Sequence, residues 1–280
     1  MSLPRTLLIA ASAFGLLGLQ ATAQAAVAPQ DLVAPITDYK LYVLDNLEQF
    51  TSHSREFTDA IKAGDLAKAQ ELYAPSRVYY ERIEPIAELF ADLDASIDAR
   101  EDDYEKGVKD PVFTGFHRLE YGLFHDQSTD GMQPFAERLM SDIEDLNQRV
   151  QGLTFPPEIV VGGAAALMEE VAATKVSGEE DRYSRTDLWD FQGNVDGAKK
   201  IFELVKPLAS KEDAAFVARV EDNFASMEAT LSHYYVEEGN VESGFVTYDK
   251  VSDADRRALV GPVTVLAEEL STLRGLLGLN

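Results

Sequence analysis

The sequence predicts an all-helical protein, and three features of its 280 residues support this fold class. Apolar residues recur at intervals of three and four almost throughout, which is the period of one helix face. Alternating β-type runs with paired turn residues are scarce, so any strands should be minor. Prolines and glycines divide the pattern into segments of helical length. Short connections between amphipathic helices favour antiparallel bundles, and this many helices can form two bundles side by side.

The N-terminal half begins with well-marked helices. The first is expected over about 35–64, since proline suits a first turn and glycine a C-terminal stop. Asp65 should cap a helix over 66–73. Pro75 should open the next helix, and the acidic stretch 92–103 is expected to be a turn or loop.

The rest of the chain is expected to hold six more helices. Each is bounded by glycine-, proline- or serine-containing turns, and the region 239–249 should separate the last two. The expected ranges are 112–125, 132–152, 158–174, 187–207, 212–236 and 253–277.

The first 25 residues are expected to be a cleaved secretory signal peptide. Arg5 gives the positive start, 6–19 is apolar, and Ala23-Gln24-Ala25 matches a cleavage site. The apolar run is shorter than the ~20 residues needed to span a bilayer. We therefore expect a periplasmic protein whose residues 26–280 form one structural unit.

Composition restricts the function further. The chain has no cysteine, which excludes disulfides and thiolate metal sites. Its formal net charge is −24, and removal of a signal peptide that contains Arg5 and no acid leaves −25. Such a surface repels phosphate backbones and attracts cations, so nucleic acid is not expected as a partner.

An H-x-x-E motif is the first candidate for chemistry. His117 and Glu120 are three residues apart in an expected helix, so their side chains project from nearly the same face. Helix-bundle metalloproteins draw carboxylates and Glu/His pairs from facing helices into one cation site. The spacing also arises by chance with both residues facing solvent, so the motif alone indicates a metal site only weakly.

Two acidic segments are further candidates. Glu81, Glu84 and Glu88 share a helical stripe, which taken alone is more typical of a solvated face. The segment 178–190 is rich in acids, and its Asp187 is better explained as a helix cap than as a ligand. The other three histidines are expected to be structural, although His125 follows the H-x-x-E helix closely enough to remain an outside candidate.

Several enzyme signatures are missing from the sequence. It contains no H-E-x-x-H helix, no G-x-S-x-G elbow, no phosphate-binding loop and no dinucleotide fingerprint. Metal-assisted hydrolysis by another geometry stays open, because a glutamate beside a bound cation can act as a general base.

Taken together, the motifs resemble the imelysin-like family, which contains the EfeO/EfeM-type periplasmic proteins of bacterial iron uptake. The similarity covers about residues 36–280. It rests on G-F-H-R-x-E, on Y-E-R-I-E-P-I-A-E followed by F-x-D-L-D-x-x-I-D-x-R, and on E-E-D-R-Y-S-x-T-D-L-W-D-F. Longer members carry an N-terminal cupredoxin domain, for which this sequence has no room, so the chain resembles the short form.

The resemblance implies two four-helix lobes with a cation site in the cleft between them. It also implies which side chains form that site. The candidate ligands are His117, Glu120, Glu81, Glu84, Asp98 and Glu180. Of these, Glu120 and Glu84 are the ones that could support other ligands rather than bind the metal themselves.

The resemblance further implies a non-enzymatic protein that captures ferrous or ferric iron and passes it to an Efe-type inner-membrane permease. A periplasmic haem peroxidase of the same system would be a second partner. Oxygen ligands with one imidazole also suit zinc, copper or manganese. Two alternatives stay open: a metallopeptidase, the class in which the imelysin group was first placed, and a protein that binds alginate or another polysaccharide. The negative charge disfavours direct binding of a polyanion unless cations bridge the two.

Overall fold

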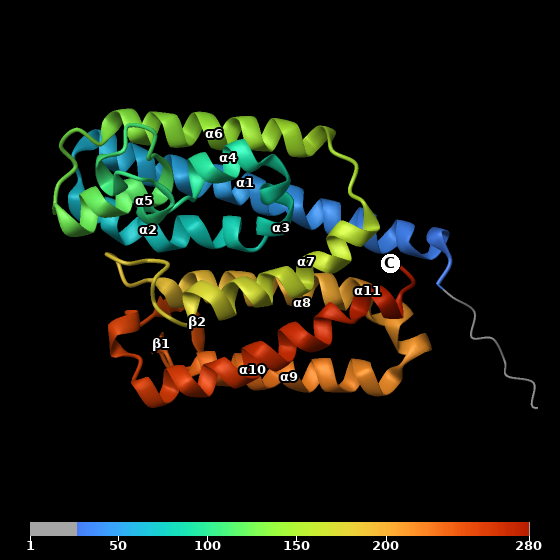
Figure 1. The fold of residues 1–280 in the computed structure, drawn as a ribbon. Helices are drawn as coiled ribbons and strands as arrows, with labels where there is room; N and C mark the ends of the chain where they lie inside the picture. The colour runs from blue at the N-terminus through green and yellow to red at the C-terminus, as the bar shows by residue number, and fades with distance from the viewer. Residues whose placement is uncertain (1–26, 280) are drawn as a thin grey trace, which may run out of the picture.

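The protein's computed structural model describes residues 27–279, and the signal peptide expected over 1–25 lies outside them. Nearly all of the described chain is helical, and its helices form two lobes that lie one against the other (Figure 1). The predicted all-helical class, with two bundle lobes packed side by side, is confirmed.

The first lobe is built on three long helices, α1 (Val33–Ala63), α2 (Leu66–Glu81) and α6 (Gln133–Gly152). α1 packs along both of the others. Three short helices complete the lobe, α3 (Glu84–Ala87), α4 (Ala91–Ile97) and α5 (Gly115–Glu120). α4 and α5 both pack on α6, so the residues that follow α4 are brought close to α5.

The second lobe is a four-helix bundle of α7 (Pro157–Glu170), α8 (Asp187–Glu212), α9 (Ala214–Ser232) and α10 (Asp253–Ser271). α8 packs on α7 and α9, and α10 closes the bundle against the same two helices. The short helix α11 (Leu273–Leu276) follows α10. An antiparallel hairpin of β1 (Tyr235–Glu237) and β2 (Asn240–Phe245) connects α9 to α10.

Irregular helical turns occur between these elements. The 3₁₀ turns are Pro29–Leu32, Glu88–Phe90, Glu101–Asp103, Gly107–Lys109 and Tyr248–Lys250. Two π-helical turns, Tyr121–His125 and Val171–Lys175, directly continue α5 and α7. π-Turns inside helices are frequent at functional sites, and both of these adjoin the charged cluster described below.

Several of the predicted boundaries are wrong. The helix expected over 187–207 runs through Pro207 to Glu212, because residues on both sides of the proline are buried, and the helix expected over 212–236 ends at Ser232, before β1.

α2 runs through Pro75, because Tyr73, Arg77 and Tyr80 lie buried along one face and packing outweighs the local preference of proline. The carbonyl left without its N–H partner is that of Glu71, an exposed residue. The stretch 92–103 is also not all loop.

The first residues of the stretch 92–103 belong to α4, where Leu93 and Ile97 are buried one turn apart. Asp92 and Asp94 lie in the first turn of α4, where a helix dipole favours negative charge. Because acidic residues surround these two apolar positions, the sequence pattern did not indicate a helix here.

The lobes meet closely where α8 crosses α2. Gly193 of α8 makes this approach possible, because a Cβ there would lie 2.6 Å from the Cβ of Glu81 and 3.0 Å from the carbonyl oxygen of Val78. Because Gly193 has no side chain, the backbone of α8 in the second lobe can pack directly against α2 in the first lobe. Side chains from both lobes therefore share one buried cluster.

No helix among residues 27–279 combines the length and the apolar character needed to cross a membrane.

Candidate metal centre

His117 lies where three segments from both lobes converge. It belongs to α5, and its Nε2 lies 3.7 Å from Oδ1 of Asp98, at the end of α4. The same nitrogen lies 3.7 Å from Oε1 of Glu180, which is in the loop between α7 and α8. One imidazole nitrogen and two carboxylate oxygens therefore face one another across a short gap.

Gly115 sets the contact between α5 and the end of α4. It has a positive φ of 81°, and a Cβ at this position would lie 2.2 Å from the carbonyl oxygen of Ile97. Only glycine fits, so α5 can begin directly against the residue that precedes Asp98. Phe116 then anchors the helix by stacking on Phe57, with ring centroids 5.8 Å apart.

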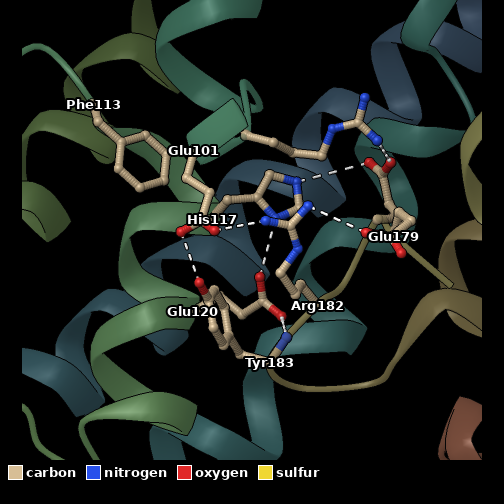
Figure 2. A pocket seen from close by; sticks show the side chains of 9 residues that line it. Glu101, Phe113, His117, Glu120, Glu179, Arg182 and Tyr183 are labelled. Atoms are coloured by element: carbon tan, nitrogen blue, oxygen red, sulfur yellow. Dashed lines mark hydrogen bonds and ion pairs between the residues drawn. The ribbon is translucent and has the colours of Figure 1, made fainter. Parts of the chain in front are cut away.

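Glu120 orients the imidazole ring. Its Oε2 lies 3.2 Å from Nδ1 of His117, so the ring N–H donates to the carboxylate. Oε1 accepts from the backbone N–H groups of Tyr183 and Ser184 and from the Ser184 hydroxyl. Figure 2 shows the two side chains facing each other, with Tyr183 on the far side of the carboxylate. Glu120 thus ties α5 to the loop of the second lobe and leaves Nε2 for Asp98 and Glu180.

Nε2 of His117 is buried and has no hydrogen-bond partner within the part of the chain that the structure describes. Burial and the Arg77 charge lower the pKa of His117, but the surrounding carboxylates outweigh them and raise it to about 10. The metal-free ring is therefore an imidazolium at neutral pH. A cation bound at Nε2 would replace a proton, so binding would release it.

Arg77 occupies the centre of the acidic cluster. Its guanidinium is fully buried and lies over the rings of Tyr73 and Phe116. Charge-assisted contacts surround it. The carboxylates within 4.0 Å are those of Glu81 at 2.8 Å, Asp98 at 2.5 Å, Asp190 at 3.2 Å, Glu180 at 3.6 Å and Asp181 at 3.8 Å.

Lys175 is the second buried cation, and the π-turn after α7 carries it. Its Nζ lies 2.8 Å from Oε2 of Glu81, 3.9 Å from Glu84 and 4.0 Å from Glu180. Although burial acts in the opposite direction, the charge of Lys175, aided by other cations, holds the pKa of Glu180 well below its usual range. Glu180 is thus an ionised carboxylate at neutral pH.

Glu84 is in a different state from Glu180. Burial raises its pKa well above the usual range, and Lys175 does not offset this. Asn194 of α8 donates to Oε2 of Glu84 and to Oε2 of Glu81. Glu84 is therefore held by an amide of the second lobe and is the less ready of the two to bind a cation.

Three groups of side chains within residues 27–279 have the spacing to hold a metal ion. The group of Glu81, Glu180 and Asp190 surrounds the Arg77 guanidinium, which takes the place of a cation. In the group of His117, Glu120 and Asp181, the imidazole uses Nδ1, which already bonds Glu120. The group of Asp98, His117 and Glu180 contains the unpartnered Nε2 and best suits a cation.

Two hollows adjoin this group. The first is a small pocket beside His117, shown in Figure 2, and Phe113, Arg182 and Tyr183 are among the residues that line it. The second is an open acidic groove that seven carboxylates and one guanidinium line. Asp98 and Glu180 both belong to the wall of the groove, so the candidate group can be reached from that side.

All six residues predicted for the site lie in one connected cluster. Asp98, His117 and Glu180 face a common gap, Glu120 holds the imidazole, and Glu81 and Glu84 contact the buried Lys175. That these side chains bind metal stays a prediction. The outside candidate His125 is exposed, pairs with Asp126, and belongs to none of the three groups.

The expected cap at Asp187 is wrong. Asp187 is the first residue of α8, and its Oδ1 accepts from the backbone N–H of Asp181 in the same loop. The side chain therefore shapes the loop that carries Glu180 rather than capping the helix.

Sequence reasoning did not identify the cations of the cluster. Arg77 precedes Glu81 by four residues, a helical pairing distance, so its contact with this residue had a local signal. Lys175 contacts Glu81 across the lobes and had no such signal. Asp190 and Asn194, buried on α8, were likewise visible only in the fold.

Comparison with known proteins gives consistent matches over nearly the whole chain. Residues 35–273 match the family model described as Imelysin. The chain is 61% identical over 266 residues to the iron uptake system component EfeM of Pseudomonas syringae, covering 95% of this chain and 92% of that protein.

It is also similar to two proteins named iron uptake system component EfeO. Identity to that of Yersinia pseudotuberculosis is 56% over 268 residues, covering 95% of this chain and 70% of that protein. Identity to that of Escherichia coli is 56% over 263 residues, covering 93% and 69%.

Proposed function

The chain belongs to the imelysin family, and we propose that it is an iron-binding component of an Efe-type uptake system. In this role it captures iron in the periplasm and delivers it to an inner-membrane permease. A haem peroxidase of the same system is a further proposed partner. We also propose that a signal peptide over 1–25 directs export. Residues 26–280 then form the iron-binding unit.

The observation that carries this proposal is the buried Nε2 of His117, which makes no hydrogen bond within residues 27–279 and faces carboxylate oxygens of Asp98 and Glu180, each 3.7 Å away. These three atoms are donors of the kind that coordinate a cation, and a cation between them would contact all three. Carboxylate oxygens with one imidazole suit iron, and hard ferric iron suits carboxylates particularly well. Zinc, copper and manganese fit the same donor types, so the metal that is bound would depend on which ions are available to the protein.

The geometry favours holding a metal over cutting a peptide. A metallopeptidase needs a carboxylate free to take a proton from a metal-bound water. Glu120, the nearest counterpart by motif, accepts from His117, from two backbone N–H groups and from a serine hydroxyl. Its oxygens are committed to positioning, so Glu120 is poorly suited to act as a general base.

Metal titration of His117→Ala tests this proposal. We expect wild-type protein to bind ferrous iron, kept anaerobic, at a defined stoichiometry, and the variant to lose more than about 100-fold in affinity, since even changes around the ligands cost 10–100-fold. His233→Ala is the matched control, because it removes an exposed imidazole at the end of α9 that belongs to none of the three groups. Wild-type affinity in His117→Ala, for iron and for zinc, would overturn the site.

A further inference from the structure

Three cations contact the candidate ligands, and they differ sharply in exposure. The side chains of Arg77 and Lys175 are 1% and 0% exposed, and each contacts at least three carboxylates. Arg100, in the turn after α4, has a side chain that is 29% exposed. Of the three, only Arg100 has solvent beside it into which its charge can move.

Arg100 holds a candidate ligand through one contact. Its Nη1 donates to Oε2 of Glu180 at 2.7 Å, while Oε1 of the same carboxylate faces Nε2 of His117. Within residues 27–279 the structure gives the Arg100 guanidinium no other hydrogen bond or ion pair. The Arg100 backbone is held independently, because its N–H donates to Asp103. The side chain can therefore turn away without unfolding the turn that carries it.

The Arg100–Glu180 pair also divides the two hollows. Both residues line the pocket beside His117, and both line the acidic groove. Apart from Arg100, the charged side chains of the groove are all carboxylates, among them Glu88, Asp94 and Glu170. A cation drawn into the groove by this charge therefore finds one cation already on its wall, the Arg100 guanidinium that is bound to Glu180.

We propose that Arg100 is a displaceable counter-ion, which neutralises Glu180 in the metal-free protein and is replaced there by the incoming metal cation. This inference rests on the proposed metal-binding function. Arg77 and Lys175 keep the acidic cluster folded whether or not metal is bound, because neither has solvent to move into. Arg100 positions Glu180 and competes with the metal for it, so it sets both the rate of capture and the affinity.

The sign of the effect separates this role from a structural one. Arg100→Gln removes the competitor for Glu180 and one positive charge from the entrance. Metal should therefore bind faster and about 3- to 10-fold more tightly, the range expected for loss of a partly exposed ion pair together with its charge. If Arg100 only held Glu180 in place, the same change would weaken binding. Arg100→Lys keeps the charge and should stay close to wild type.

The experiment measures association rate and affinity for anaerobic ferrous iron and for zinc, by stopped-flow mixing and chelator competition. Circular dichroism verifies the fold of each variant. Arg149→Gln is the matched control, because Arg149 is similarly exposed, at 35%, and pairs with Asp92 and Asp145 outside both hollows. Glu180→Gln is made alone and together with Arg100→Gln. The gain from Arg100→Gln should be clearly smaller in the Glu180→Gln background, where only the change in entrance charge remains.

Three results would overturn the role of Arg100 alone, given wild-type metal binding: unchanged or weaker binding in Arg100→Gln, an equal gain in Arg149→Gln, or a gain of undiminished size without Glu180. Failure of the wild-type protein to bind either metal would instead overturn the proposed function, and this inference with it. The two failures are therefore distinguishable in one set of measurements.

Discussion

At the scale of the residue, four donors converge on the carboxylate of Glu120 and fix what it can do. They are Nδ1 of His117, the backbone N–H groups of Tyr183 and Ser184, and the Ser184 hydroxyl. Only a carboxylate can accept all four, because an amide replaces one acceptor oxygen with a donor. The three-residue spacing that suggested a shared ligand pair has therefore produced one candidate ligand and its orienting partner.

Glu120→Gln is expected to weaken iron binding by about 10- to 100-fold while leaving the protein folded. The amide oxygen can still accept from the second-lobe loop, but its NH₂ then faces the N–H of His117. Metal binding at Nε2 needs a neutral ring with its one proton on Nδ1, and the amide instead favours the tautomer with that proton on Nε2, the atom that faces Asp98 and Glu180. Competition with a chromophoric chelator measures the affinity. Glu144→Gln, which removes an exposed carboxylate on α6, is the control. Equal affinity in Glu120→Gln and wild type would show that orientation of the ring is unimportant.

The predictability of these residues from sequence depended on whether their partners were local. His117 and Glu120 lie within one helical turn, and Arg77 lies one turn before Glu81, so helical spacing alone relates each pair. Lys175 meets Glu81 only because the two lobes pack together. No pattern in the residues around Lys175 indicates a buried partner in the other lobe.

At the scale of the element, α5 is very short for a helix that carries the central histidine, with bounds Gly115–Glu120. So short a helix has little stability of its own and depends on its contacts. The π-turn that follows, Tyr121–His125, and the aromatic anchor Phe116 hold one side of it. Gly115 fixes the other side against Ile97.

Gly115→Ala is expected to lower the free energy of unfolding by at least about 2 kcal/mol, because the left-handed backbone alone costs a non-glycine residue about 1–2 kcal/mol and the clash with Ile97 adds to it. Gly131→Ala is the matched control, since Gly131 also has a positive φ but nothing within 4 Å of an added Cβ. In Gly131→Ala the free energy of unfolding should fall only by the cost of the left-handed backbone, about 1–2 kcal/mol. Urea unfolding measures both variants, and iron affinity should fall only in Gly115→Ala. Equal losses of stability would mean that the close approach to Ile97 is unimportant.

Element boundaries were predictable where caps and spacing agreed, and not where packing overrode them. Gly64 ends α1 in the left-handed conformation, and Asp65 accepts from the N–H of Lys68 at the start of α2, both as expected. Pro75 was misread because the burial of its neighbours cannot be seen locally. α4 was misread because its acids conceal two buried apolar residues.

At the scale of the whole molecule, a protein with a formal charge of −24 buries carboxylates from both lobes around two cations. The two-lobe arrangement was predictable from helix number and from family resemblance, but the close packing of the two lobes was not. In this packing α8 approaches α2 closely enough for Asn194 to donate hydrogen bonds to Glu81 and Glu84. A rigid junction of this kind would leave capture and release of a cation to local side chains such as Arg100.

Gly193→Ala tests whether the junction is rigid. The added Cβ would meet the Cβ of Glu81 at 2.6 Å and the carbonyl oxygen of Val78 at 3.0 Å, neither of which is the mobile end of a side chain. Overpacking of this kind costs about 1–3 kcal/mol, so the melting temperature should fall. Iron affinity should fall as well, because Glu81 contacts both Arg77 and Lys175.

Gly152→Ala is the control, since Gly152 also lies in a helix and an added Cβ there meets nothing within 4 Å. Alanine has the higher helix propensity, so this variant should match or slightly exceed wild type in stability. Lobes joined by a compliant hinge would absorb the extra methyl group by a small opening, and both melting temperature and iron affinity would then be unchanged in Gly193→Ala. A loss of both in Gly193→Ala, against none in Gly152→Ala, would show that close packing of the lobes maintains the charged cluster.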